Sequence, residues 1–384
     1  MAILSATMKS KTFLPLFCLL PLFACQAGSV QLWTGDVLKG RVALEGAGFV
    51  VYPDQAPGAP APAPQKVELA KARDAVFNEQ QQQEREPMQQ PGVFLTNGSF
   101  IAGNTHGLEN PIVKVESQDV PAAAIAWIIF RPSPLSKFPT IPHGHTGAIL
   151  TTGDFFEGTF AGVRDYHYGV NSALFGPQRF TGEQLIAIIL HDRQESHSLF
   201  QVTQSNGSCY QTDDLKWDKQ FLSFQDSVLG AFKIKLTDIR EIAAGSGRYL
   251  VITSVPPMGE TAISGTNADD PIRVQPATDP GAPDILLTRA NFPVSYAVPL
   301  GLTVFTSSVS IPKDAPAGTR FTFAVYGDGK FLIQRSLPMA VGDPPQALRA
   351  ELNNVHAITL RAEPSFPGMD KVYGQWTGPM LFHP

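Results

Sequence analysis

The chain of 384 residues has only three cysteines, and charged residues make up only 16% of it. Cys18 and Cys25 lie near its start, so Cys209 is the one cysteine further along. A disulfide scaffold is therefore excluded, and stability must come from buried apolar cores. Long helices are also lacking: no helical period lasts beyond about three turns, and the best helical candidate, 67–77, is brief.

Basic residues are too few for a nucleic-acid surface. Lys and Arg number 29 against 34 Asp and Glu, the net charge is −5, and no basic stripe alternates with aromatic residues. We therefore expect no nucleic-acid partner. The chain does have 33 glycines and 33 prolines, a composition that favours many short strands and turns. We expect an all-β protein of several domains.

The first 27 residues predict a secretory signal peptide. Two lysines precede an apolar run from Phe13 to Ala24, and small residues follow. This run is too short to span a bilayer, which takes about 20 residues. Residues 22–25 also resemble a bacterial lipobox, in which Cys25 would carry a lipid. We expect export to the medium, periplasm or cell envelope, and a membrane contact only through such an anchor.

One short motif occurs four times before residue 245. Its glycines are Gly35, Gly98, Gly153 and Gly207; a Thr or Asn precedes each, and an Asp or Ser follows. Gly and Asn tolerate positive φ, so each motif predicts a hairpin. A unit of about 45 residues is marginal alone and must close into a barrel or stack on its neighbour. Tandem Sm- or SH3-like barrels and one continuous stack of β-units both fit.

These observations divide the chain into seven segments. They are a signal peptide (1–27), a β-repeat with an Ala/Pro-rich insert (28–77), a Gln-rich linker (78–91), three further β-repeats (92–131, 146–192 and 198–245) and a C-terminal module (250–384).

The most specific feature of the sequence is the stretch 320–332. Phe321, Phe323 and Val325 alternate with other residues at the strand period of two. Gly327-Asp328-Gly329 supplies the positive φ that a tight hairpin turn needs, and a return strand begins at Phe331.

With its surroundings this hairpin resembles the NPCBM family, carbohydrate-binding modules first noted beside glycoside hydrolases. A strand pair at 294–311 precedes the hairpin, and strands at 348–361 and Trp376 follow it in the family's order. The resemblance implies a galactose-binding-like jelly-roll β-sandwich with a carbohydrate ligand. The chain departs from the family in two ways: residues 262–292 lack a Gly-x-Gly-x-His-type segment, and the acidic residues before Trp376 are reduced to Asp370.

Five residues of this module are candidates for glycan binding, because sugar rings stack on aromatic side chains and polar side chains bond the hydroxyls. They are Tyr373, Trp376, Tyr326, Asp328 and Lys330. Trp376 also suits a core position, and Asp328 suits a turn. Tyr373 is the best single candidate, because it lies in the loop before the final strand and jelly rolls commonly bind ligands at loop ends. The other tryptophans, Trp33, Trp127 and Trp217, are expected to be structural.

No catalytic, cofactor or metal site is predicted. The sequence has no nucleophile elbow, phosphate-binding glycine loop, paired metal-ligand motif or HExxH helix. His143-Gly144-His145 could place two imidazoles near one metal, but a solvent-exposed turn explains it better.

We therefore expect a secreted, non-catalytic carbohydrate-binding protein that recognises a polysaccharide or envelope glycan. Two alternatives stay open. One is a structural scaffold that has no sugar site and binds envelope proteins. The other is an unrecognised glycoside hydrolase with Asp154 and Glu157 as its carboxylate pair.

Overall fold

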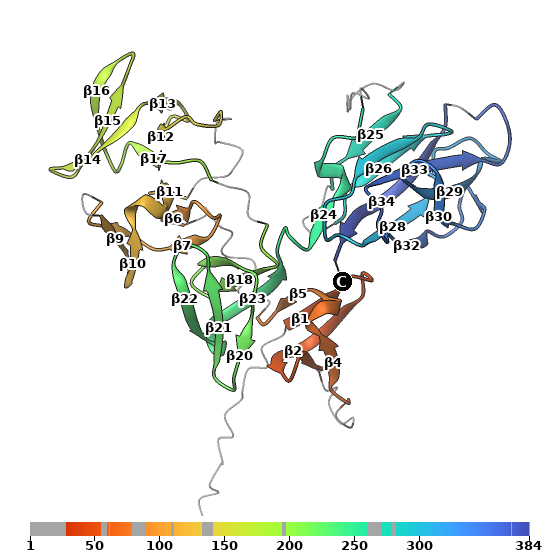
Figure 1. Ribbon diagram of the computed structural model, residues 1–384, viewed down its shortest axis with the longest axis horizontal. Coiled ribbons are helices and arrows are strands. Elements are labelled where there is room, and N and C mark those ends of the chain that lie inside the picture. The colour runs from red at the N-terminus through yellow and green to blue at the C-terminus, as the bar shows by residue number, and fades with distance from the viewer. Residues whose placement is uncertain are drawn as a thin grey trace, which may run out of the picture.

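The computed structural model describes residues 28–54, 60, 62–78, 90–108, 111–132, 141–193, 197–259, 270–277, 282–369 and 371–383. Over these residues the chain is all-β, with short 3₁₀ turns, which confirms the predicted fold class (Figure 1). No helix in this part of the chain is long and apolar enough to cross a membrane. The predicted signal peptide, Cys25, most of the Gln-rich linker and Asp370 lie outside the described residues.

Four groups of strands, here called units 1 to 4, precede the C-terminal module. Unit 1 contains β1 (Gly28–Leu32), β2 (Val37–Glu45), β3 (Gly48–Tyr52), β4 (Gln65–Glu68), η1 (Leu69–Lys71) and β5 (Ala72–Val76). Unit 2 contains β6 (Gly92–Leu95), β7 (Phe100–Ala102), β8 (Thr105–His106), β9 (Ile112–Val115), β10 (Gln118–Pro121), η3 (Ala122–Ala124) and β11 (Ile125–Ile129). The helical candidate 67–77 is thus wrong: two strands flank a single 3₁₀ turn there.

The other two units follow the same plan. Unit 3 contains β12 (Gly147–Leu150), β13 (Phe155–Glu157), β14 (Thr159–Arg164), β15 (His167–Ser172), β16 (Gly176–Thr181) and β17 (Leu185–Ile189). Unit 4 contains β18 (Phe200–Gln204), β19 (Cys209–Thr212), β20 (Lys216–Trp217), β21 (Phe221–Asp226), β22 (Gly230–Lys235), η5 (Leu236–Asp238) and β23 (Ile239–Ala244).

The same hairpin turn opens each unit. In unit 1, Gly35 N–H donates to the Leu32 carbonyl at 3.0 Å, and Leu32 N–H donates to the Asp36 carbonyl at 2.9 Å. The corresponding pairs of bonds recur at 95–99, 150–154 and 204–208. The four motif glycines have φ between 86° and 92°, a conformation that side chains with a Cβ rarely adopt, so glycine sets this three-residue loop.

Within each unit the first strand lies between the second and the last. β1 pairs with β2 and β5, β6 with β7 and β11, β12 with β13 and β17, and β18 with β19 and β23. Each unit therefore has the same central order of three strands, and strand pairs also join one unit to the next. β5 pairs with β23, β19 with β7, and β11 with β17. The spatial order is consequently 1, 4, 2, 3, as Figure 1 shows from orange through green and gold to yellow-green.

Each contact between units joins equivalent residues. The last strand of each unit has one residue at an equivalent position, opposite the second or third residue of that unit's first strand. In units 1 to 4 these residues are Ala75, Ile128, Ile188 and Ile242. Across the unit contacts Ala75 faces Ile242 and Ile128 faces Ile188. Equivalent residues meet only around a local two-fold axis, so units 1 and 4, and units 2 and 3, form pseudo-symmetric pairs.

A third local axis lies between units 2 and 4. Phe100 faces Cys209, and two serines from the motif turns make the same contact in each direction. Ser99 Oγ accepts the Gln211 N–H at 3.0 Å, and Ser208 Oγ accepts the Ala102 N–H at 3.1 Å. Both serines are buried. Units 1 and 3, which carry Asp at this turn position, take no part in this contact.

The C-terminal module is a β-sandwich of two antiparallel sheets. The first sheet contains β24 (Tyr249–Val251), β25 (Ile272–Gln275), β26 (Ile285–Arg289), β34 (Tyr373–Phe382), β28 (Val304–Ser310) and β32 (Gln346–Glu351); η6 (Ile252–Ser254) follows β24. The second contains β27 (Val294–Ala297), β33 (Ala357–Pro364), β29 (Arg320–Gly327), β30 (Phe331–Arg335) and β31 (Met339–Ala340). The predicted hairpin is β29–β30, and its buried Phe321, Phe323 and Val325 face the core.

An aromatic joint connects the sandwich to the units. Trp33 of unit 1 packs with Ala244, Tyr249 and Phe382 in one apolar cluster. Arg248, which is 4% exposed, donates from its guanidinium to the Ala70 carbonyl at 3.0 Å. The sandwich is therefore held against unit 1 as well as by its covalent link to unit 4.

Candidate functional site

Tyr373 lies at one end of the sandwich, at the first position of β34 opposite Arg289. Its hydroxyl accepts a hydrogen bond from Arg273 at 3.0 Å and donates one to the Asp270 carbonyl. The guanidinium carbon of Arg273 lies 4.3 Å from the centre of the ring. Tyr373 is half-buried, so an aromatic ring and the guanidinium group that lies over its face meet at this end, a combination that suits hydroxyl-rich ligands.

Trp376 is a core residue and not a ligand contact. It is 0% exposed, and its indole Nε1 donates to Thr288 Oγ1 at 2.9 Å. Phe323 packs edge-on against it, with ring centres 5.2 Å apart. A side chain that is sealed in this way has no face left for a sugar ring, because strand parity turns it into the sandwich.

Asp328 is occupied by the backbone. It has φ of 47° in the hairpin turn, and its carboxylate accepts the N–H groups of His356 and Ala357, both at 3.0 Å. These bonds hold the pKa of Asp328 below its ordinary value. The side chain thus ties the β29–β30 turn to the start of β33, while the neighbouring Lys330 is exposed.

Tyr326 belongs to a polar cluster on the outer face of the second sheet. Its hydroxyl donates to Glu363 Oε1 at 2.6 Å, and Arg335 donates to Glu363 Oε2 at 2.7 Å. The guanidinium carbon of Arg361 lies 5.8 Å from the Tyr326 ring centre. This is a second half-buried aromatic position surrounded by hydrogen-bonding groups.

The predicted residues do not form one site. Asp328 binds the start of β33, whereas the chain beside Tyr373 meets its far end, where Asn291 N–H donates to the Ala362 carbonyl at 2.9 Å. Asp328 and the adjoining Lys330 therefore lie toward the opposite end of the sandwich from Tyr373, whereas Tyr326, whose hydroxyl reaches Glu363, lies on the outer face of the second sheet. Sequence order alone could not show this, because the positions fall on different sheets.

The other chemical candidates each have their own partner. His143 lies 3.9 Å from Asp192, and His145 bonds Glu157 at 2.7 Å. Asp154 accepts the Thr152 hydroxyl at 2.8 Å in the motif turn. Over the described residues no group of three or more His, Cys, Asp or Glu could hold a metal ion.

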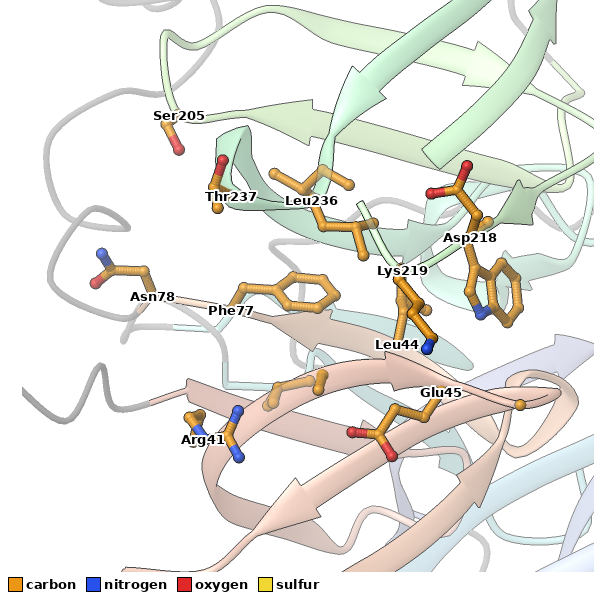
Figure 2. Close-up of a pocket in the computed structure, with 15 residues that line it drawn as sticks. Arg41, Leu44, Glu45, Phe77, Asn78, Ser205, Asp218, Lys219, Leu236 and Thr237 are labelled. Carbon is orange, nitrogen blue, oxygen red and sulfur yellow. The ribbon is translucent and has the colours of Figure 1, made fainter. Parts of the chain in front are cut away.

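A groove between units 1 and 4 was not foreseen from the sequence (Figure 2). It has a volume of about 780 Å³. Unit 1 contributes residues 41–46 together with Phe77 and Asn78, and unit 4 contributes Trp217 to Lys219 and residues around η5. Trp217 was expected to be structural, and it is half-buried on one wall of this groove. The groove exists only because units far apart in sequence pair through β5 and β23.

Residues 285–382 match the NPCBM/NEW2 domain. This match confirms the resemblance to the NPCBM family predicted for the C-terminal module. No curated protein matches the chain.

Several solved structures show similarity. The CBM51-2 and INT domains of ZmpB from Clostridium perfringens, in complex with GlcNAc, are 14% identical, with 56% of this chain and 43% of that chain covered and a TM-score of 0.29. A CBM51 from Clostridium perfringens GH95 with methyl-galactose is 12% identical over 35% of this chain and 99% of that one, with a TM-score of 0.28. The tandem CBM51 modules of Sp3GH98, a family 98 glycoside hydrolase of Streptococcus pneumoniae, are 11% identical over 77% and 88%, with a TM-score of 0.29. The chain thus spans less than half the length of the first of these proteins.

Proposed function

We propose that this protein binds a carbohydrate without catalysis, and that the ligand is a polysaccharide or a cell-envelope glycan. The observation that carries the proposal is the NPCBM/NEW2 match over 285–382, which covers nearly all strands of the sandwich. We place the glycan at the end of the sandwich that carries Tyr373 and Arg273.

The chemistry of that end supports the proposal. The Arg273 guanidinium lies over one face of the Tyr373 ring, so in this proposal the C–H face of a sugar ring stacks on the opposite face. Arg273, held on Tyr373 by a 3.0 Å bond, would then lie beside the ring hydroxyls. Because Arg273 and the Asp270 carbonyl orient the phenol, little side-chain entropy would be lost on binding.

A glycan-array screen followed by titration tests the site. We expect one sugar class to bind, and Tyr373→Ala to weaken binding at least tenfold, or about 1.4 kcal/mol. Tyr166→Ala is the matched control, because Tyr166 is 93% exposed on unit 3 and far from the sandwich in the chain. It should leave affinity unchanged.

The same screen separates the alternatives. Loss of binding in Tyr326→Ala but not in Tyr373→Ala would move the site to the outer face of the second sheet. If the folded protein binds no glycan, the proposal is wrong and an envelope scaffold is the better explanation.

We also propose that the protein is exported. The apolar run 13–24 and the lysines before it support a signal peptide. Cell fractionation with wild type and Cys25→Ala distinguishes the two modes: an anchored protein moves from the membrane to the soluble fraction, whereas a freely secreted one is unaffected. Retention of both in the cytoplasm would contradict export.

A further inference from the structure

The ring of Tyr326 lies flat on the outer face of the second sheet. Glu363 is opposite Thr322, four residues before Tyr326 on β29, yet the tyrosine hydroxyl bonds Glu363 Oε1 at 2.6 Å. Four residues of a strand span about 13 Å, so the ring must lie along the strand to reach that carboxylate. Ala324, which lies between them on the same face, is 0% exposed, as expected if the ring covers it.

Two arginines flank this ring. Arg361 on β33 and Arg335 on β30 both lie opposite Ala324, one on each side of β29. Their Cα atoms are therefore about 10 Å apart, because neighbouring strands are spaced by about 4.8 Å. The guanidinium carbon of Arg361 is 5.8 Å from the Tyr326 ring centre, against 4.3 Å for the arginine that lies over Tyr373. Arg361 thus lies toward the edge of the ring and does not stack closely on it.

The charges around the ring are unequal. Both oxygens of Glu363 are engaged, one by the Tyr326 hydroxyl and the other by Arg335 at 2.7 Å. Arg361 is 4.0 Å from Glu363, and its buried Nε has no hydrogen-bond partner among the described residues. One carboxylate therefore balances two guanidinium groups. The side chains of Arg335 and Arg361 are 46% and 37% exposed, so a ligand can reach them from solvent.

The neighbouring charges do not cancel this excess. Arg320 is exposed and shares the outer face with the ring by strand parity. Asp343 lies beside it, because Asp343 accepts the N–H of Ala340, which is opposite Arg320. At the other end of β29 the hairpin turn carries Asp328 and Lys330. These two cations and two anions sum to zero, so one positive charge remains in excess at the ring.

We propose that this outer face binds an acidic glycan, with a sugar ring on Tyr326 and the sugar's oxyanion, a uronate carboxylate or a sulfate ester, on Arg361. Sugar C–H faces pack on aromatic rings, and a guanidinium group binds an oxyanion through two parallel hydrogen bonds. A neutral sugar would leave the excess charge without a partner. The inference rests on the proposed carbohydrate binding, but its site is separate, because Tyr326 and Tyr373 belong to different sheets.

Two matched pairs of polymers test the charge requirement on the wild-type protein. They are polygalacturonate with its full methyl ester, and dextran sulfate with dextran. We expect one charged polymer to bind at least tenfold more tightly than its uncharged counterpart, which corresponds to about 1.4 kcal/mol. A preference within the first pair identifies a carboxylate as the ligand group, and a preference within the second identifies a sulfate.

Substitution of Arg361 tests the position of the site. Arg361→Gln should lower the affinity for the preferred charged polymer about tenfold, and Arg361→Lys should recover only part of it, because an ammonium group cannot form the two parallel bonds. Arg349→Gln is the matched control. Arg349 is 48% exposed, pairs with Glu351 at 3.0 Å and lies 5.4 Å from the Phe382 ring centre, but it belongs to the first sheet. It should leave the affinity unchanged although the same charge is lost.

Two results would overturn the inference. One is equal binding of the charged and uncharged polymers in both pairs, which needs no variant and so cannot come from misfolding. The other is an equal loss in Arg361→Gln and Arg349→Gln, which would indicate a diffuse effect of net charge. Neutral-glycan binding that depends on Tyr373, without any preference for charge, would remove this inference and leave the proposed function standing. Failure of every glycan to bind, neutral or charged, would remove both.

Discussion

Trp33 of unit 1 stacks on Phe382 near the C-terminus, with ring centres 4.7 Å apart and planes 11° from parallel. Tyr249 flanks Trp33 at 6.1 Å. The Trp33 indole Nε1 also donates to the Ala70 carbonyl at 3.1 Å, so the ring is fixed from the unit 1 side. Two ends of the described chain thus meet in a stacked, buried contact that sets the orientation of the sandwich relative to the units.

Trp33→Ala should loosen this joint. Truncation of a buried tryptophan costs about 3 kcal/mol or more, and here the loss falls on the contact between modules. We expect a lower midpoint in urea unfolding and a larger radius of gyration in solution scattering. Trp33→Phe, which keeps an aromatic ring against Phe382, should retain most of the compactness. An unchanged radius in Trp33→Ala would mean that the covalent link alone orients the sandwich.

Ser99→Ala should destabilise the protein more than Ser208→Ala. Both hydroxyls accept a backbone N–H across the local axis, but Ser99 also donates to the buried Asp226 carboxylate at 2.7 Å. An orphaned buried polar group costs about 1–3 kcal/mol, and Ser99→Ala leaves two such groups. Chemical denaturation of both variants measures the difference. Equal losses would show that the Asp226 bond contributes nothing.

Asp74 and Glu241 should make stability fall as pH rises through the mildly acidic range. Burial raises the pKa of both carboxyls, and the charge of Asp74 raises that of Glu241 further. The folded protein therefore holds these protons to higher pH than the unfolded chain. The stabilisation that these bound protons contribute is full at pH values below the ordinary pKa values of 3.8 for Asp74 and 4.5 for Glu241. It is lost as the pH rises through the raised pKa values of the folded protein.

Asp74→Asn tests this dependence. It removes one titrating group and the charge that acts on Glu241, so the free energy of unfolding should rise near neutral pH and its slope between about pH 4 and 7 should flatten. Arg73 and Arg240 lie 3.9 Å from Asp74 and Glu241 and limit the effect. Glu68→Gln, whose side chain is 66% exposed in the wild type, serves as the control with an unchanged slope. A steeper slope in Asp74→Asn would refute the assignment.

Cys209 should resist thiol reagents while the protein is folded. Burial raises its pKa to about 12, so almost no thiolate exists at pH 8, and the side chain is 3% exposed. Labelling with iodoacetamide, read by mass spectrometry on the peptide containing Cys209, should require denaturant. Fast labelling of the native protein would show that the contact between β7 and β19 opens readily.

Features set by neighbouring residues were accessible from sequence. The glycines of the motif turns, the β29–β30 hairpin and the alternation of Phe321, Phe323 and Val325 follow from φ preferences and strand parity, which act over a few residues. The stretch 67–77 misled for the same local reason. Its residues tolerate a helix, but pairing of β4 with β3 and of β5 with β1 and β23 overrides that preference.

Features set by distant pairing were not accessible. The order 1, 4, 2, 3, the groove beside Arg41 and the separation of Tyr373 from Tyr326 all depend on which strands meet across the molecule. One signal was present: the residue after the motif glycine alternates as Asp36, Ser99, Asp154 and Ser208. The two serines lie in units 2 and 4, which share the third axis, because a small hydroxyl fits the buried backbone contact there and a carboxylate would not.

The crossed order of the units makes each half of this region dependent on the other. Over the described residues no strand pair joins unit 1 to unit 2; unit 1 pairs with unit 4, and unit 2 pairs with units 3 and 4. Units 1 and 2 therefore pair with units 3 and 4 as the two subunits of a homodimer would, although all four units belong to one polypeptide. A cut between units 2 and 3 would break no strand pair among the described residues, so we expect the severed pieces to stay together as a two-chain complex.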